Sequence, residues 1–598
     1  MRAWGHTQEA CPMQLFEQDR NNSQPILGDI VDQFFAPVQF DALTQLASEF
    51  QRLKARIVEV HGIITEEKVS GVMGYFFSGN SSDQYGHSAM LRHTSSFNEI
   101  FSLDGALNDL TATFWSRALN QTDLQEHMPQ ARRRQWHECL NAWRQRGYQR
   151  GANPELDMPE FTLDNLRATI QGLMARRAEF LAERVDGIFR NLSRSHVTNT
   201  PEGFAKRMIL SHIYSDFGTT DHDREGYIHD LRLVIAKFMG RDDPRRDTTT
   251  HLLNLARAHR GEWIEADCGS LRVRAYKVGT AHLEVHPDMA WRLNGILAFL
   301  HPMAIPESAR TRPKRAKACG FKSKALFDRP ISNAAAGVLA AMGQYFTLEP
   351  STSFRREYDR KFVPNTLCVR YSSAELSKHL LDEVSGVLEA LGGVACNGGK
   401  LKNMRYWQFA YNPEQVVRAV AVSGQLPDAK SHQFYPTPAP VAERLVQWLD
   451  IQPTETCLEP QAGQGGIADL LPKDRTLCVE VSPLHGMILR EKGHTVIEGD
   501  FLAWNPGTLF DVIACNPPYS EGRWQAHLRH AGALVEAGGR LGAVLPLSAR
   551  QQAAELLPGF DLEFSAPIDN AFAGTSISVL LLKATKAKTK GGQMGLGL

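Results

Sequence analysis

The residues best suited to chemistry are Asn516, Pro517, Pro518 and Tyr519, which directly follow the apolar run at 511–515. The two prolines fix φ and donate no hydrogen bond, so the segment is stiff and its carbonyls stay free to accept from an NH₂ group. The Asn516 amide offers a further acceptor, and the Tyr519 ring offers a face for stacking. Such a strand end is suited to holding a planar amino or amide nitrogen. The plain alternative is an Asn-Pro turn after a strand.

A Gly-rich turn lies upstream of this segment. An apolar strand ends at Glu459 and Pro460 and runs into Ala462, Gly463 and Gly465. Glycines at such a turn let the backbone approach a ligand where a Cβ would clash. The apolar stretch at 467–471 predicts that a helix follows. The order of strand, turn and helix is the one that a nucleotide-type pocket needs.

Further apolar runs predict strands that also end in polar residues. The strand at 476–481 carries Glu480 near its end, where an acid can accept from both ribose hydroxyls of a nucleoside or can simply lie at the surface. The strand at 495–501 ends in Asp500, which can accept from an adenine amino group, and Phe501, which can cover the ring. Strands alternating with helical stretches predict an α/β fold, a Rossmann-like doubly wound parallel sheet with ligands beyond the carboxyl ends of its strands.

The motifs in this order resemble a known family. Residues 431–584 resemble the class I S-adenosyl-L-methionine-dependent methyltransferases of the amino-group type, and specifically the N6-adenine DNA methyltransferases with the γ order of motifs. Residues 433–438, Gln-Phe-Tyr-Pro-Thr-Pro, resemble the motif that precedes the Gly-rich loop there, and 571–576 resemble its late aromatic segment.

The resemblance implies an adenine-specific, site-specific DNA methyltransferase with S-adenosyl-L-methionine as cofactor and double-stranded DNA with a flipped adenine as partner. It implies catalytic roles for Asn516, Pro517, Pro518 and Tyr519 and contacts to the base from Tyr519 and Phe572. Combined with the strand-end reasoning, it gives this expected cofactor set: Phe434, Tyr435, Pro436, Thr437, Pro438, Glu459, Pro460, Ala462, Gly463, Gly465, Glu480, Asp500, Phe501 and Asn516.

The chain departs from the γ pattern in two places. The γ enzymes usually carry a recognition domain after the catalytic one, whereas here Leu598 follows soon after the last predicted strand, and 520–529 leaves little room for an inserted loop. We therefore expect DNA recognition upstream of residue 431 or in a partner.

The upstream sequence predicts a mainly helical α+β region at 1–305, a basic connector at 306–430 with a possible role in DNA recognition, and the methyltransferase domain at 431–598. Helical spacing appears at 41–64, 161–192 and 226–239, a hairpin at 271–285, and a helix opening at Trp291. Residues 190–300 resemble a domain of unknown function, DUF4942, through the segments 196–200, 206–209 and 279–283.

The formal net charge of the 598 residues is zero, so any attraction to nucleic acid must come from local patches. Basic side chains gather at 132–134, with Arg144 and Arg146, at 310–324 and at 355–361. Each can be a solvated face. The cluster at 310–324 is the best candidate for DNA phosphate contacts.

Other features exclude some classes of protein. The 9 cysteines form no Cys-x-x-Cys pair and the 21 histidines show no ligand spacing, so we expect neither a metal site nor a disulfide framework. No transmembrane run or signal peptide is seen, which predicts a cytoplasmic protein without membrane contact. The oligomeric state and any paired restriction nuclease are not predicted.

Three other interpretations stay open. The Asn-Pro-Pro-Tyr tetrapeptide also occurs in enzymes that methylate a glutamine amide in release factors, and in enzymes that methylate guanine N2 in ribosomal RNA. A non-catalytic DNA-binding, anti-restriction protein could retain the same fold.

Overall fold

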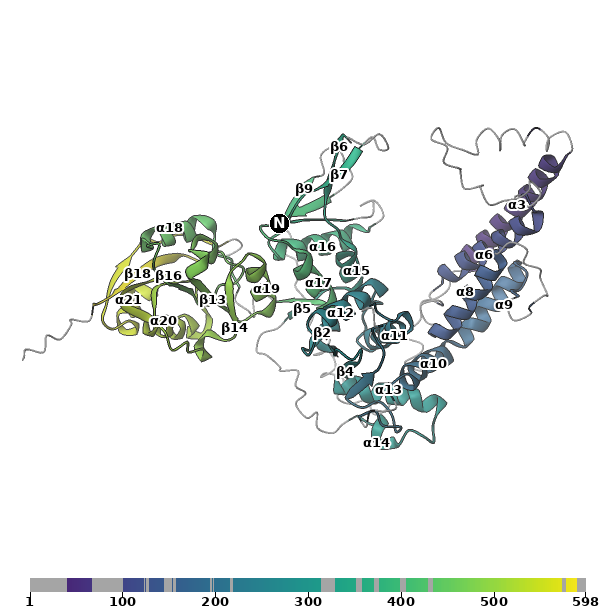
Figure 1. The fold of residues 1–598 in the computed structure, drawn as a ribbon, viewed down its shortest axis with the longest axis horizontal. Helices are drawn as coiled ribbons and strands as arrows, with labels where there is room; N and C mark the ends of the chain where they lie inside the picture. The colour runs from purple at the N-terminus through teal and green to yellow at the C-terminus, as the bar shows by residue number, and fades with distance from the viewer. Residues whose placement is uncertain are drawn as a thin grey trace, which may run out of the picture. The chain divides into compact units, whose positions relative to one another are not determined.

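The computed structural model describes residues 40–66, 72, 101–122, 124, 128–144, 153, 157–193, 196, 198–215, 219–312, 328–350, 358–369, 376–397, 405–427, 434–572 and 577–588. The chain divides into two compact units. One comprises residues 19–238 and 276–316, and the other comprises 1–18, 239–275 and 317–598. Figure 1 shows the helices and strands of both.

The unit formed by 19–238 and 276–316 is mainly helical. Its helices are α3 (Phe40–Thr65), α6 (Leu103–Asn120), α8 (Gln130–Arg144), α9 (Leu163–Ala175), α10 (Arg177–Arg190), α11 (His222–Phe238), α13 (Pro287–Leu300) and α14 (Glu307–Arg310). Strands β1 (Arg207–Leu210) and β4 (Ala281–Val285) pair antiparallel. Aromatic side chains fill the core between α3, α6 and α9, where the ring of Phe161 lies 4.7 Å from that of Phe50 and 5.2 Å from that of Trp115.

The helices expected at 41–64 and 226–239 are confirmed as α3 and α11. The single helix expected over 161–192 is wrong, because Arg176 leaves the helical conformation (φ −97°, ψ 8°) and separates α9 from α10. The turn of the expected hairpin closes where the Tyr276 N–H donates to the Thr280 carbonyl at 2.9 Å. The helix expected to open at Trp291 begins earlier, at Pro287, a residue favoured in the first helical turn.

The arginines at 132–134 lie on α8 and do not form an unpaired basic face. Each bonds to a carboxylate on α10 or α11. The pairs are Arg132 with Glu183 (2.7 Å), Arg133 with Asp230 (2.8 Å) and Arg134 with Asp223. These ion pairs join helices within the unit and neutralise the cluster.

The other unit contains a small α/β region upstream of residue 434. It comprises α12 (Arg246–Ala258), β2 (Ile264–Ala266), β3 (Leu271–Ala275), β5 (Asp328–Pro330), α15 (Asn333–Ala341), β6 (Phe346–Pro350), β7 (Tyr358–Phe362), β8 (Thr366–Cys368), α16 (Lys378–Ala390), β9 (Val394–Asn397), β10 (Arg405–Gln408), α17 (Glu414–Ser423) and β11 (Gln425–Pro427). Strands β8, β10 and β9 form an antiparallel sheet. Its core includes Trp407, which is 1% exposed, and apolar residues of α15, α16 and α17. Residues 328–427 are called the middle region below.

The C-terminal part of this unit is built on a seven-stranded sheet in the order β14-β13-β12-β15-β16-β18-β17. The strands are β12 (Cys457–Glu459), β13 (Thr476–Glu480), β14 (Thr495–Glu498), β15 (Phe510–Cys515), β16 (Val535–Pro546), β17 (Phe560–Phe564) and β18 (Val579–Lys586). The first five are parallel, and β18 runs antiparallel to both of its neighbours. This arrangement agrees with the expected α/β sheet.

Helices cover both faces of this sheet, as Figure 1 shows for α18 (Ala439–Leu449), α20 (Arg523–Ala533) and α21 (Ala549–Leu556). In β15, Val512 and Ala514 pack with α18, whereas Ile513 and Cys515 pack with α20 and α21. Burial on both faces explains why the sequence of this strand is a continuous apolar run.

One helix expected beside this sheet is wrong, and one of its strands was not expected. The stretch at 467–471 forms only a 3-10 turn at Ala468–Leu470, because Leu471 is already extended (φ −89°, ψ 157°) and Pro472 follows it. Strand β17 was not expected, since its residues are half-exposed and two of them, Asp561 and Glu563, are acidic.

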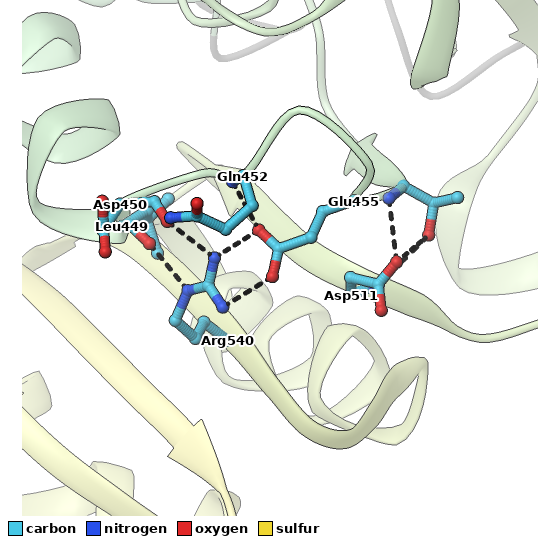
Figure 2. Close-up of polar contacts among 7 residues, drawn as sticks. Leu449, Asp450, Gln452, Glu455, Asp511 and Arg540 are labelled. Carbon is cyan, nitrogen blue, oxygen red and sulfur yellow. Dashed lines mark hydrogen bonds and ion pairs between the residues drawn. The ribbon is translucent and has the colours of Figure 1, made fainter.

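A polar cluster fastens the amino-terminal edge of the sheet (Figure 2). The Arg540 guanidinium donates twice to Glu455, at 2.9 and 2.5 Å, and also to the carbonyls of Leu449 and Asp450. Asp511 accepts from the backbone N–H and the hydroxyl of Thr456. The cluster ties the loop between α18 and β12 to β15 and β16, which leaves the carboxyl edge for the site.

Candidate active site

The candidate site lies at the carboxyl ends of β12 and β15. From β12 the chain continues to β13 and β14 on one side of the sheet, and it returns to β15 and β16 on the other. This reversal is the topological switch point at which open α/β sheets bind ligands. A cavity of about 910 Å³ lies there.

Sixteen of the residues expected in a site line this cavity: Phe434, Tyr435, Pro436, Thr437, Glu459, Pro460, Ala462, Gly463, Glu480, Asp500, Phe501, Asn516, Pro517, Pro518, Tyr519 and Phe572. Pro438 and Gly465 do not line it. Pro438 precedes α18 as its N-cap, and Gly465 (φ +91°) lies against Asp469 and Leu489 inside the turn. Gln433 and residues 573–576 lie outside the described residues.

The conformation of Gly463 explains why a glycine stands there. Its φ is +53°, and a Cβ would lie 2.7 Å from the ring of Phe434. A side chain would therefore be both strained and in collision with the segment that precedes α18. The Gly463 N–H donates to the Glu480 carboxylate at 2.7 Å, which joins the Gly-rich turn to the end of β13.

Glu480 is buried and hydrogen-bonded. It also accepts from the Ser482 N–H at 2.8 Å and lies 3.7 Å from His485 Nδ1. Burial alone would raise the pKa of Glu480, but His485 and the two N–H donors outweigh burial and lower it. Glu480 is therefore an ionised acceptor at the cavity wall.

The pKa of Glu459 is shifted in the opposite direction from that of Glu480. Glu459 is 2% exposed, and among the described residues its Oε2 has no hydrogen-bond partner. Burial raises the pKa of Glu459 well above its ordinary value. A cation beside this carboxyl group would supply the missing partner and favour its ionised form.

The strand expected at 495–501 is shorter in the structure, because β14 ends at Glu498 and Asp500 is the N-cap of a 3-10 turn that begins at Phe501. Asp500 Oδ1 accepts from the Leu502 N–H at 3.0 Å. Phe501 is 3% exposed and packs against His530, with 4.6 Å between ring centroids. Phe501 is therefore a packed part of the cavity wall, and its ring offers little exposed surface for stacking.

Sequence reasoning missed Gln461 and His527, which also line the cavity. The Gln461 amide lies 2.7 Å from His527 Nδ1, and Gln461 Oε1 is buried without a partner among the described residues. Burial lowers the pKa of His527 to about 4, so the imidazole is neutral near pH 7. A Gln inside the Gly-rich turn was a visible signal, whereas a lone His on a helix was not.

Asn516 is held by both the preceding motif and its own tetrapeptide. Its Nδ2 donates to Thr437 Oγ1 at 3.1 Å and lies 3.4 Å from the Tyr435 carbonyl. Its Oδ1 accepts from the Tyr519 hydroxyl at 3.1 Å. These bonds orient the amide so that its oxygen has one acceptor position left.

Three aromatic rings surround the mouth of the cavity near Asn516. The centroid of Phe572 lies 6.2 Å from that of Tyr435 and 6.4 Å from that of Tyr519. Phe572 is buried, whereas the Tyr435 side chain is 41% exposed. The rings form an apolar wall that suits a flat ligand.

Two further statements hold for the described part of the chain. It contains no cluster of His, Cys, Asp and Glu side chains suited to a metal ion. None of its helices is long and apolar enough to cross a membrane. Most of the basic cluster at 310–324 lies outside the described residues, as do Arg146, Arg355 and Arg356.

Comparison with protein families gives one match. A model described as a domain of unknown function, DUF4942, matches residues 107–302. The match confirms the resemblance expected at about 190–300 and extends it upstream. None of the curated proteins matches the chain.

Solved structures similar to this chain include several methyltransferases. Magnesium protoporphyrin IX methyltransferase from Synechocystis PCC 6803, with bound S-adenosylmethionine, is 14% identical, over 25% of this chain and 79% of its own, with a TM-score of 0.22. Precorrin-6y C5,15-methyltransferase from Geobacter metallireducens GS-15 is 18% identical, over 25% and 88%, with a TM-score of 0.21. A modification subunit assigned to a type I restriction enzyme from Vibrio vulnificus YJ016 is 18% identical, over 29% and 53%, with a TM-score of 0.23. At these identities and TM-scores the likenesses support no conclusion about substrate.

Proposed function

We propose that this protein transfers a methyl group from S-adenosyl-L-methionine to the N6 amino group of adenine in DNA. The observation that carries the proposal is the meeting of two parts in one cavity. The Gly463 turn with its acidic side chains lies on one side, and the Asn516 tetrapeptide lies on the other. The first part suits a nucleoside with a cationic group, and the second suits a planar amine.

The residues of the cavity fit this cofactor. A volume of about 910 Å³ is within the range of small-molecule sites. The unpartnered Oε2 of Glu459 would pair with the cofactor's ammonium group. Glu480 would accept from the ribose hydroxyls, since each carboxylate oxygen can accept a further hydrogen bond. Asp500 would accept from the cofactor's adenine amino group.

When bound, the cofactor supplies an electrophilic methyl group on its sulfonium. The N6 atom of adenine is a poor nucleophile because its lone pair is delocalised into the ring. Asn516 Oδ1 and the Pro517 carbonyl would each accept one N–H of this amine and direct its lone pair toward the methyl group. As the C–N bond forms, the bond from the methyl carbon to sulfur would break and leave S-adenosylhomocysteine. The amine becomes acidic only as the methyl group transfers, so one N–H proton would pass to water without a strong base, and catalysis would consist mainly of alignment and electrostatics.

In duplex DNA the target base must leave the stack before it can reach this amine site. Tyr519, with Phe572 and the half-exposed Tyr435, would hold the extruded base by ring contacts. DNA recognition would lie upstream of residue 431. The basic cluster at 310–324 would contribute phosphate contacts, so that neutralising three of its residues weakens binding and flattens its salt dependence.

The experiment is transfer of radiolabelled methyl groups by the full-length protein to DNA, to ribosomal RNA and to a release factor in parallel. We expect label in DNA as N6-methyladenine, lost in Asn516→Ala and kept in Asn505→Ala. Asn505 is a matched control, because its amide oxygen only accepts from the nearby Gly507 N–H, at 3.2 Å. Label in ribosomal RNA alone would assign guanine N2 as the substrate. Label in the release factor alone would assign its glutamine amide. Cofactor binding without transfer to any substrate would favour a non-catalytic binding protein.

A further inference from the structure

Helix α19 (Pro483–Glu491) has two different neighbours. On the cavity side, the His485 ring lies 4.4 Å from that of Phe434. Toward the middle region, Ile488 is fully buried in that region's core, and Leu484 and Met487 pack against the same core. The helix therefore forms a shared wall between the cavity and the middle region.

A second connection runs through Gln464, in the Gly-rich turn. Gln464 lines the cavity, and its Nε2 donates to the Ala390 carbonyl at 2.7 Å. Ala390 is the last residue of α16, and the last carbonyls of a helix have no partner within it. A side chain from the Gly-rich turn thus caps the end of a middle-region helix.

The backbone of the same turn is held from α19. The Lys492 ammonium, directly after this helix, donates to the Gln464 carbonyl at 2.7 Å and to Asp469 at 2.6 Å. Gln464 is consequently bonded through its backbone to the end of α19 and through its side chain to the end of α16. A shift of either helix would move the turn.

The end of α16 is itself fixed by the middle region. The Tyr411 hydroxyl donates to the Leu391 carbonyl at 2.9 Å, one residue beyond Ala390. Tyr411 is 3% exposed and does not line the cavity. It offers a way to loosen the end of α16 without touching any residue at the candidate cofactor site.

We propose that Gln464 is a positioning residue that ties the Gly-rich turn to the end of α16, so that the middle region helps to set the affinity for the cofactor. The inference rests on the cofactor site proposed above and goes beyond it. Residues 328–427 would then help to hold the Gly-rich turn of the cofactor site in position. By thermodynamic reciprocity, a partner that shifted the end of α16 would change cofactor affinity, and the cofactor would change affinity for that partner by the same factor.

The test is a double-mutant cycle on the full-length chain, with calorimetric binding of S-adenosylhomocysteine as the readout. We expect Gln464→Ala to weaken binding roughly three- to tenfold, the effect of one hydrogen bond. Tyr411→Phe should weaken it in the same direction. In the Gln464→Ala background, Tyr411→Phe should have no further effect, because the connection through which it acts is already cut. Gln452→Ala is the matched control, since that amide also donates to a backbone carbonyl, that of Asp450 at 3.0 Å, at the opposite edge of the sheet.

Melting temperatures of all variants separate loss of fold from loss of affinity. Wild-type affinity in Tyr411→Phe, or equal losses from Tyr411→Phe in both backgrounds, would overturn the inference and leave the proposed function standing. Failure of the unaltered chain to bind the ligand would overturn the cofactor site, and this inference with it.

Discussion

The hydroxyl of Tyr519 lies 3.1 Å from Oδ1 of Asn516 and equally far, 3.1 Å, from the Val544 carbonyl. A hydroxyl has one proton to donate, so Asn516 Oδ1 and the Val544 carbonyl share it, and at most one acceptor position of Oδ1 is occupied. Burial raises the pKa of the Tyr519 phenol above its ordinary value, so the hydroxyl keeps its proton at neutral pH. The tetrapeptide therefore contains its own device for orienting the amide.

We predict that Asn516→Ala keeps cofactor binding and loses methyl transfer by a factor on the order of 10²–10³. The amide is placed at the mouth of the cavity, whereas the acidic residues proposed to bind the cofactor belong to other strands. Single-turnover transfer and calorimetric cofactor binding measure the two effects. Full transfer activity in this variant would contradict the mechanism.

We predict that Tyr519→Ala costs roughly 1–3 kcal/mol of base binding, because a stacking face is removed. Tyr519→Phe should be milder, since its ring remains, but transfer should still fall, because the bond that orients Asn516 is lost. The comparison requires the rate constant for transfer as well as the KM for DNA. A Tyr519→Phe enzyme with an unchanged rate constant would show that the hydroxyl has no orienting role.

We predict that Gly463→Val abolishes cofactor binding, because a Cβ at this position would lie 2.7 Å from the Phe434 ring. Gly559→Val is the control. Gly559 also has a positive φ (+81°), but no atom lies within 4 Å of its Cβ position, so this variant tests backbone strain alone. Calorimetry should detect binding in the control only. Wild-type affinity in Gly463→Val would remove the Gly-rich turn from the cofactor site.

The Arg540 cluster predicts a pH-dependent contribution to stability. The Arg540 hydrogen bonds lower the pKa of Glu455 below its value in the unfolded chain, ~4.3. The ionised carboxylate therefore stabilises the fold fully above pH ~4.3, and the contribution is lost as the pH falls through the lower folded pKa. Arg540→Ala should lower the free energy of unfolding by about 2 kcal/mol at pH 7 and by less under acidic conditions.

Arg475→Ala is a suitable control for that measurement. Arg475 is 43% exposed, lies 3.8 Å from Asp474 and donates a single hydrogen bond, to the Thr454 carbonyl at 3.2 Å, so its removal should change stability by no more than about 1 kcal/mol. Denaturant unfolding at pH 7 and pH 4 gives the four values required. An Arg540→Ala effect that grew on acidification would contradict the assigned ion pair.

The sequence was most informative where chemistry and a strand end coincide. Asn516, Gly463 and Glu480 each follow or end an apolar run, and parallel strands bring their carboxyl ends to one edge, so their convergence could be expected. The contact of Gln461 with His527 could not, because it joins segments 66 residues apart and His527 belongs to no local pattern. Likewise, the arginines at 132–134 looked like an unpaired basic patch until the fold placed carboxylates of α10 and α11 beside them.

The two outer strands of the seven-stranded sheet have a consequence for the surface of the protein. Strand β14 ends with Glu498, bonded to Arg490, and β17 carries the exposed residues Asp561 and Glu563. The unpaired backbone groups of an outer strand can template the addition of another chain. A strand added beside β14 or β17 would have to remove water from these carboxylates, which costs free energy. This cost opposes edge-to-edge association of the sheet with another molecule.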